Sequence, residues 1–432
     1  MLLPQGGASA MCGLLQERKR AMLMYHVQHL SKSEICRQLK RPRVWLDRWL
    51  ERYDPGDVEQ SLRDHKDGPK RPGSQWSTEI RQQVIQMRKD RSQQEQWRYA
   101  FFGAEAIHLE LKALSSPEVP PVRTIHTWLV AEDLVRHAEK SEEQREPKPI
   151  PLPAADQVNR VQQLDLKGPV YLSGSHTKYY VVVLRDRYSH RCALDIFDSR
   201  EAQPIVEFLV TNWRWVGLPD HLQMDNALEF RGSNRYPRSF GRVIRVAVSL
   251  NVEPIFNPPS EPWRNGGVEH FNGFVGGRLL KVPFADAPAF RAESWACQEA
   301  CNQTHRLPAF DGQTPNEIAA HATLRFPPEG YNRHQERQLA QDQGFVSFVR
   351  LVRKSGRITL GARDRFMVDP DLAYQYVLAR VDLAEKVVRI SHNDEVLKTY
   401  DFSPETVGAW AEDARQEQEP VDDEVVKELW IM

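Results

Sequence analysis

Proline stands at four alternate positions about a third of the way along this chain, at Pro147, Pro149, Pro151 and Pro153. Each proline removes a backbone donor and biases the residue before it away from the helical conformation, so no helix runs through this segment. Helical patterns fill the residues before it, and short β-rich runs fill the residues after it. With 432 residues, of which 41% are hydrophobic and 27% charged, the chain is expected to form about three folded units.

The part before the prolines predicts helix-turn-helix units. Residues 17–52 hold three helical segments, in which Ser31 and Glu34 form a capping box and Pro42 suits the first turn of the third segment. Three helices within about 35 residues are typical of a helix-turn-helix, and a plain three-helix bundle is the alternative. The candidate DNA contacts on the third segment are Arg41, Arg43 and Arg48.

A second helical unit of the same kind follows, with segments at 78–91, 104–114 and 122–134. Its candidate DNA contacts are Arg123 and His126, at the start of the last segment. The linker between the two units is rich in glycine, proline and charge, and it contains Lys70 and Arg71. These two residues are candidate contacts to a minor groove, and a solvated linker is the alternative.

The part after the prolines predicts a mixed sheet flanked by helices. Strands are expected at 161–166, 178–185, 191–197, 221–224 and 252–256, with an amphipathic helix at 202–216. Strands first and interleaved helices later are typical of an α/β domain. Residues 344–402 then alternate in short strands with Gly356 and Gly361 at turns, which predicts a small β-barrel.

Three carboxylates occupy positions that suit a metal site on such a sheet. Asp165 falls inside the first strand, Asp225 directly follows the fourth, and Glu269 stands at the head of a helix. Carboxylate oxygens are ligands that Mg²⁺ and Mn²⁺ prefer, and three carboxylates can hold two ions. Two such ions can activate an attacking oxygen and stabilise a leaving one in phosphodiester transfer.

The sequences around these residues resemble the signature segments of a known family. Asp165 lies in Gln163-Leu-Asp-Leu-Lys-Gly168, Asp225 in Gln223-Met-Asp-Asn-Ala-Leu-Glu-Phe230, and Glu269 in Gly266-Gly-Val-Glu-His-Phe-Asn-Gly273. These segments are similar to those of the integrase-core DDE transposases of bacterial insertion sequences, which are relatives of retroviral integrase. The resemblance covers residues 158–320, and its third segment is the most specific. Two departures are Ala227, where the family has glycine, and the 43 residues between Asp225 and Glu269.

The resemblance implies a ribonuclease-H-like core in which Asp165, Asp225 and Glu269 are both catalytic residues and ligands of two Mg²⁺ or Mn²⁺ ions. It implies a DNA transposase that binds element ends, cleaves at their 3′ ends, joins them to target DNA, and works as a homo-oligomer on DNA. Further candidate phosphate contacts near the core are Arg264, Asn265, His270 and Lys281. The rival functions are a catalytically silent DNA-binding regulator and a metal-dependent DNA nuclease.

The expected organisation is multidomain, and the ends of the chain differ in character. The expected parts are a helix-turn-helix at 1–55, a basic linker at 56–76, a second helix-turn-helix at 77–136, a linker at 137–157, the catalytic core at 158–325, a small β-barrel at 340–403 and an acidic tail at 404–432. From Glu405 onward nine acidic residues face two basic ones, so the tail is expected to avoid DNA. Its apolar end favours docking of an accessory protein or ATPase, and a disordered solubilising end is the alternative. No apolar run approaches the roughly 20 residues of a membrane span, so we expect no membrane partner and a cytoplasmic location. The resemblance to bacterial transposases implies that this location is associated with the bacterial nucleoid.

Overall fold

The computed structural model describes residues 7–63, 76–135, 149–232, 238–261, 266–331, 343–361 and 364–404. The chain divides into two compact units, Met1–Gln75 and Trp76–Met432. The predicted contacts Lys70, Arg71, Arg264 and Asn265, and the acidic tail from residue 405, lie outside the described residues. No helix within the described ranges combines the length and apolar composition of a membrane span.

The first unit is helical, with its own hydrophobic core. Its helices are α1 (Gly7–His26), α2 (Lys32–Leu39), α3 (Arg43–Arg52) and α4 (Val58–Ser61). Ser31 caps α2 by accepting a hydrogen bond from the Glu34 backbone N–H, as the sequence predicts. Leu46 and Trp49 on α3 are buried against α1 and α2 residues, so the opposite face of α3 is exposed.

The second unit begins with three more helices, α5 (Thr78–Gln93), α6 (Ala104–Ala113) and α7 (Val122–Ala131), with a 3₁₀ turn η1 (Glu95–Trp97). The segment after η1 contacts two later helices, α11 (Gly266–Arg278) and α12 (Ala287–Thr304). Arg98 and Tyr99 both donate hydrogen bonds to Glu293 on α12, and Phe101 stacks on Phe274 of α11. These helices therefore pack directly on the α/β part of the unit.

A large mixed sheet forms the centre of the second unit. Its first strands are β1 (Val161–Tyr171), β2 (Lys178–Asp186), β3 (Cys192–Phe197), β4 (His221–Met224) and β5 (Glu253–Phe256). Their order in space is β3-β2-β1-β4-β5, in which β2 is antiparallel to both of its neighbours, β1 and β3, while β4 is parallel to β1 and β5 is parallel to β4. This order places β1 beside β4, so that Asp165, within β1, and Asp225, directly after β4, lie on neighbouring segments.

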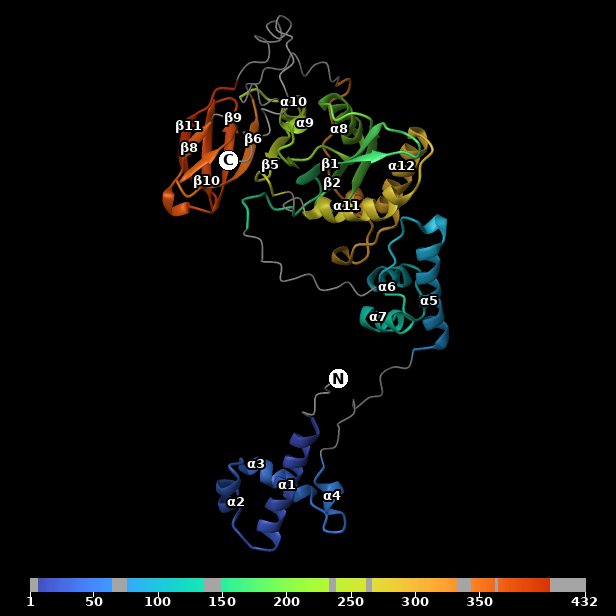
Figure 1. The fold of residues 1–432 in the computed structure, drawn as a ribbon, viewed down its shortest axis with the longest axis vertical. Helices are drawn as coiled ribbons and strands as arrows, with labels where there is room; N and C mark the ends of the chain where they lie inside the picture. The colour runs from blue at the N-terminus through green and yellow to red at the C-terminus, as the bar shows by residue number, and fades with distance from the viewer. Residues whose placement is uncertain are drawn as a thin grey trace, which may run out of the picture. The chain divides into compact units, whose positions relative to one another are not determined.

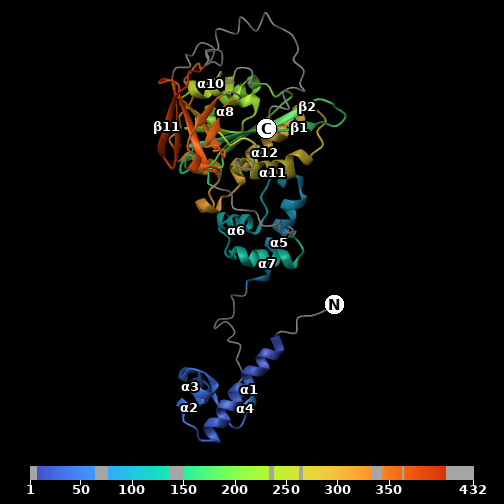
Figure 2. The ribbon, with the colours of Figure 1, turned by 60° about the vertical axis from the view of Figure 1, so that its left-hand side comes forward.

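Helices cover both faces of this sheet (Figures 1 and 2). On one face, α8 (Ala202–Val216) and α10 (Arg242–Ser249) bury Trp213 and Ile244 against the strands. On the other face, α11 and α12 bury Phe271, Val275 and Phe290. The remaining elements of this part are α9 (Leu228–Arg231), η3 (Leu279–Lys281), η4 (Pro308–Phe310) and α13 (Pro315–Ala320).

The C-terminal strands continue the same sheet. They are β6 (Phe345–Leu351), β9 (Tyr376–Asp382), β10 (Val387–His392) and β11 (Glu395–Asp401), with β7 (Arg357–Thr359) and β8 (Arg365–Met367) as a separate pair and η6 (Pro370–Leu372) between β8 and β9. Strand β6 pairs in parallel with β5 through Phe256 and Phe348, so the sheet has nine strands in a row. The expected small barrel is not confirmed among the described residues, because alternation in sequence reveals the two faces of a strand but not the strand beside which it will lie.

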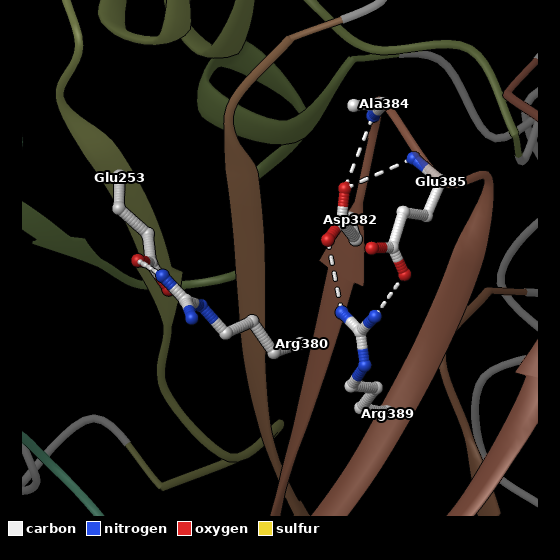
Figure 3. A network of polar contacts seen from close by, with 6 residues as sticks. All are labelled: Glu253, Arg380, Asp382, Ala384, Glu385 and Arg389. Carbon is white, nitrogen blue, oxygen red and sulfur yellow. Dashed lines mark hydrogen bonds and ion pairs between the residues drawn. The ribbon is translucent and has the colours of Figure 1, made fainter.

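A polar network fastens these strands to the core (Figure 3). Arg380 on β9 donates two hydrogen bonds to Glu253 on β5, at 3.0 and 2.8 Å, and thereby spans β6. Asp382 accepts hydrogen bonds from Arg389 on β10 and from the backbone of the β9–β10 turn. Such bidentate pairs add geometric specificity to the junction.

Candidate active site

The register of β1 and β4 brings two of the predicted carboxylates together. Gln163 on β1 lies opposite Gln223 on β4, and Asp165 and Asp225 each follow two residues later. Side chains alternate along a strand, so each aspartate is on the same face as the glutamine before it. Asp165 and Asp225 therefore occupy equivalent positions on two neighbouring parallel segments.

Helix α11 lies against β1 beside Asp165. The side-chain amide of Asn272 donates a hydrogen bond to Oδ2 of Asp165, and Lys167 Nζ donates to the backbone oxygen of Asn272 at 2.7 Å. A Cβ atom at Gly276 would lie only 2.7 Å from Lys167 Nζ, so the absence of a side chain there leaves room for the lysine. These contacts hold Asn272 and Asp165 in one arrangement.

The same helix carries Glu269, whose side chain lies outside the described residues. Its position on α11 is three residues before Asn272, and residues three apart are neighbours on a helix surface. Arg185 on β2 holds the first turn of this helix, because its Nη1 donates to the Gly267 backbone oxygen at 2.6 Å and its guanidinium covers the Phe271 ring. Glu269 therefore belongs to the same helix that contacts Asp165 through Asn272.

Asp225 is half-buried and has a carboxyl group that is costly to ionise. Its Oδ1 accepts a hydrogen bond from the Ala227 backbone N–H at 2.9 Å. Desolvation raises the pKa of Asp225, the Ala227 N–H opposes this, and the nearby Glu229 raises it further. Glu229 is itself paired with Arg200. Ala227 has a φ of −59°, so an alanine at this position brings no left-handed strain.

A row of buried side-chain amides joins β1, β4 and the end of β5 next to the two aspartates. Gln163 Nε2 donates to Gln223 Oε1 at 3.0 Å, and Gln223 Nε2 donates to Asn257 Oδ1 at 2.7 Å. Gln163, Gln223 and Asn257 are all at most 2% exposed. A buried hydrogen-bonded network of this kind specifies one arrangement of its strands, because each broken link leaves polar groups without partners.

We expect Gln223→Leu to destabilise the second unit by roughly 2 to 4 kcal/mol, because it leaves one amide on Gln163 and one oxygen on Asn257 buried without this partner. The measurement is the urea dependence of thiol labelling at Cys192, a buried residue of β3. Gln82→Leu, at an exposed position of α5, is the matched control and should leave the midpoint unchanged. Equal midpoints for wild type and Gln223→Leu would contradict the supporting role of the amide row.

The donors at this site fit a divalent cation. Asp165 and Asp225 supply carboxylate oxygens, which Mg²⁺ and Mn²⁺ prefer. The Oδ1 atom of Asn272, next to Asp165, is buried and has no hydrogen-bond partner among the described residues. Within the same residues no three His, Cys, Asp or Glu side chains gather as a metal site, a search that excludes the side chain of Glu269.

The raised pKa of Asp225 predicts a gain of stability in the Asp225→Asn variant without metal. A carboxyl whose folded pKa is raised stabilises the fold below its unfolded pKa, and this contribution is lost as pH rises through the folded pKa. The metal-free variant should therefore melt at a higher temperature than wild type at neutral pH, and the difference should shrink below about pH 4. Differential scanning calorimetry in chelator checks this, with the exposed Asp311→Asn as control.

The predicted DNA contacts differ in their availability. Arg43 and Arg48 are exposed on α3, whereas Arg41 is engaged by Glu17 of α1 through two hydrogen bonds of 3.0 and 2.7 Å. The other predicted contacts within the described residues are all exposed, and they are Arg123 and His126 on α7, His270 on α11 and Lys281 in η3. Arg41 is therefore held by a hydrogen-bonded carboxylate, whereas Arg43, although it lies 3.8 Å from Asp47, and the other predicted contacts are exposed.

Several residues that build the site were not predicted from the sequence. Gln163 and Gln223 each stand two residues before an aspartate, and this repeated Gln-x-Asp pattern was the available indication. Arg185, Lys167 and Asn257 carry no local pattern, because their roles depend on contacts between distant segments.

Comparison with known proteins gives matches among solved structures. The catalytic core domain of HTLV-2 integrase, solved in complex with magnesium in a dimeric form, is 18% identical, covers 38% of this chain and 99% of its own, and has a TM-score of 0.30. The catalytic core domain of BIV integrase is 17% identical over 38% of this chain and 94% of its own, with a TM-score of 0.30. A chain of the simian T-cell lymphotropic virus intasome in complex with PP2A regulatory subunit B56 gamma is 16% identical. The match covers 68% of this chain and 96% of the intasome chain, with a TM-score of 0.33. No protein-family model matches this chain, and no curated protein matches it.

Proposed function

We propose that this chain is a DDE transposase of the bacterial insertion-sequence type, which binds the ends of a mobile element, cleaves at their 3′ ends and joins them to target DNA. The observation that carries the proposal is the register of β1 and β4, which sets Asp165 and Asp225 at equivalent positions beside the helix of Glu269. The strand order β3-β2-β1-β4-β5 with helices on both faces supports a ribonuclease-H-like core.

The proposed roles follow from the contacts of each residue. Asp165, Asp225 and Glu269 are the ligands and catalytic residues, Asn272 orients the Asp165 carboxylate, and the Ala227 N–H orients that of Asp225. Two Mg²⁺ or Mn²⁺ ions held there would activate the attacking oxygen and stabilise the charge on the phosphate. His270 and Lys281, which are exposed on α11 and η3, offer cationic or hydrogen-bonding groups to the DNA backbone, and Arg264 and Asn265 are proposed for the same role.

DNA recognition is proposed to reside in the helical units. The exposed Arg43 and Arg48 on α3, and Arg123 and His126 on α7, suit contacts in a major groove. Lys70 and Arg71 are proposed to contact the backbone or minor groove between the two units. A homo-oligomer on DNA would supply one active site for each element end.

The experiment that tests the function uses a labelled end oligonucleotide, supercoiled target DNA and Mg²⁺ or Mn²⁺. A transposase yields both end cleavage and covalently joined target, with no protein–DNA covalent intermediate. A metal-dependent nuclease yields cleavage without joining, and a DNA-binding regulator yields only a shifted band. Absence of joined product with an end DNA that the protein binds specifically would overturn the proposal in favour of one of these rivals.

The acidic tail supports one more proposal about partners. Nine acidic residues against two basic ones from Glu405 onward disfavour contact with DNA, and the tail ends in Leu429-Trp-Ile-Met432. We propose that this segment docks an accessory protein or ATPase of the transposition machinery in the bacterial nucleoid.

A further inference from the structure

Arg350 on β6 is a buried arginine whose hydrogen bonds all go to uncharged oxygens. It is 3% exposed, and no carboxylate among the described residues accepts a hydrogen bond from it. Burial, helped by repulsion from Arg231, lowers its pKa to about 9, so the guanidinium is still charged at neutral pH. A buried charge without an opposite partner is costly, and such a cost is expected where a group has a specific task.

The acceptors of Arg350 come from three segments besides its own strand, which supplies the Val349 backbone oxygen. Its Nη2 donates to the side-chain oxygen of Asn226 at 3.0 Å, just after β4. Its Nη1 donates to the backbone oxygens of Asn257, just after β5, and Val349, at 3.3 and 2.9 Å. Its Nε donates to the Thr359 backbone oxygen at 2.9 Å, at the end of β7. One side chain thus joins the C-terminal strands to two loops of the core.

Both loops belong to the candidate active site. Asn226 is the residue directly after Asp225, and its Nδ2 donates to the Asn257 backbone oxygen at 2.6 Å. Asn257 also ends the buried amide row through its Oδ1. Arg350 and Asn226 therefore share one acceptor and fix the chain on the C-terminal side of Asp225, while the amide row supports the strand before it.

We propose that Arg350 is a positioning residue for Asp225, so that the C-terminal strands complete the active site. The inference rests on the proposed function for the role of Asp225, but its geometric part concerns the Asp225 turn itself. A guanidinium presents five donors in a planar fork, which suits acceptors on several segments, whereas a lysine ammonium offers only three donors from one atom.

The first test follows the turn itself and needs no activity. Hydrogen–deuterium exchange at the Ala227 amide, which donates to Asp225, should be at least about tenfold faster in Arg350→Gln than in wild type. Arg380→Gln is the matched control, because Arg380 joins the same strands to β5 without contacting Asn226. Equal exchange rates at the Ala227 amide in Arg350→Gln and Arg380→Gln would overturn the proposal. If Arg350→Gln fails to fold, Arg350→Lys serves as the milder variant.

The second test separates positioning from general stability. Arg350→Lys should keep end binding and KM for target DNA near wild type while the rate constant of strand transfer falls about tenfold or more, with Arg350→Gln lower still. Arg380→Gln should keep the wild-type KM for target DNA and the wild-type rate constant of strand transfer. Wild-type rates in both Arg350 variants would overturn the role of Arg350 and leave the transposase proposal intact. If wild type itself joins no DNA, the function fails, and the exchange experiment still decides whether Arg350 holds the turn.

Discussion

Asp165→Asn, Asp225→Asn and Glu269→Gln should each lower strand transfer by about a thousandfold or more, because loss of one ligand removes several kcal/mol of transition-state stabilisation. End binding should stay within about twofold of wild type, since the proposed recognition helices are far along the chain from these residues. The measurement is a single-turnover assay with labelled end DNA and supercoiled target, beside a mobility-shift titration.

Two features of the chain make this result interpretable. Asp311→Asn and Glu329→Gln change exposed residues outside the site, and they should transfer strands at the wild-type rate. Asp225→Asn is expected to be more stable than wild type without metal, so its inactivity would not come from unfolding. Strand transfer near the wild-type rate by any one of the three carboxylate variants would remove that residue from the active site.

Much of the core could be predicted from local patterns. The helix expected at 202–216 is α8, and the strand expected at 221–224 is β4. The helix is strongly amphipathic, and Gly217 ends it before the short strand begins. Period and flanking residues decide such elements locally. The order of the strands and the continuation of the sheet from β5 into β6 depend on pairing over about 90 residues, which no local pattern encodes.

The residues of the candidate site also differ in whether a local sequence pattern indicates them. Asp165 and Asp225 could be proposed as site residues from the sequence because their motifs are contiguous. Arg350 could not be proposed in this way, since it is one basic residue in a strand that is apolar except for Ser347, and its acceptor on Asn226 is 124 residues away. Likewise, nothing near Arg41 indicated that Glu17 would engage it. Tertiary contacts therefore decide which basic residues are available to DNA.

The second large effect is expected in DNA binding by the first unit. Reversing Arg43 and Arg48 to glutamate in the full chain should weaken binding to end DNA by roughly 100-fold or more at low salt, because removing an arginine that binds a base or a phosphate costs about 1 to 3 kcal/mol. Both side chains are exposed on α3, while Leu46 and Trp49 on the same helix are buried in the unit's core. The substitutions should therefore leave folding unchanged.

The control for this prediction keeps the change of charge and moves it to another surface. Arg20→Glu with Arg63→Glu alters two exposed residues of the same unit outside α3. If long-range electrostatics alone governed binding, both double variants would lose the same amount of affinity. Each variant would also lose as much affinity for random duplex as for end DNA. Recognition by α3 instead predicts that only Arg43→Glu with Arg48→Glu lowers the preference for end DNA over random duplex, and that its log affinity falls less steeply with log salt. A titration series across salt concentrations decides between the two, and equal losses would place sequence recognition outside α3.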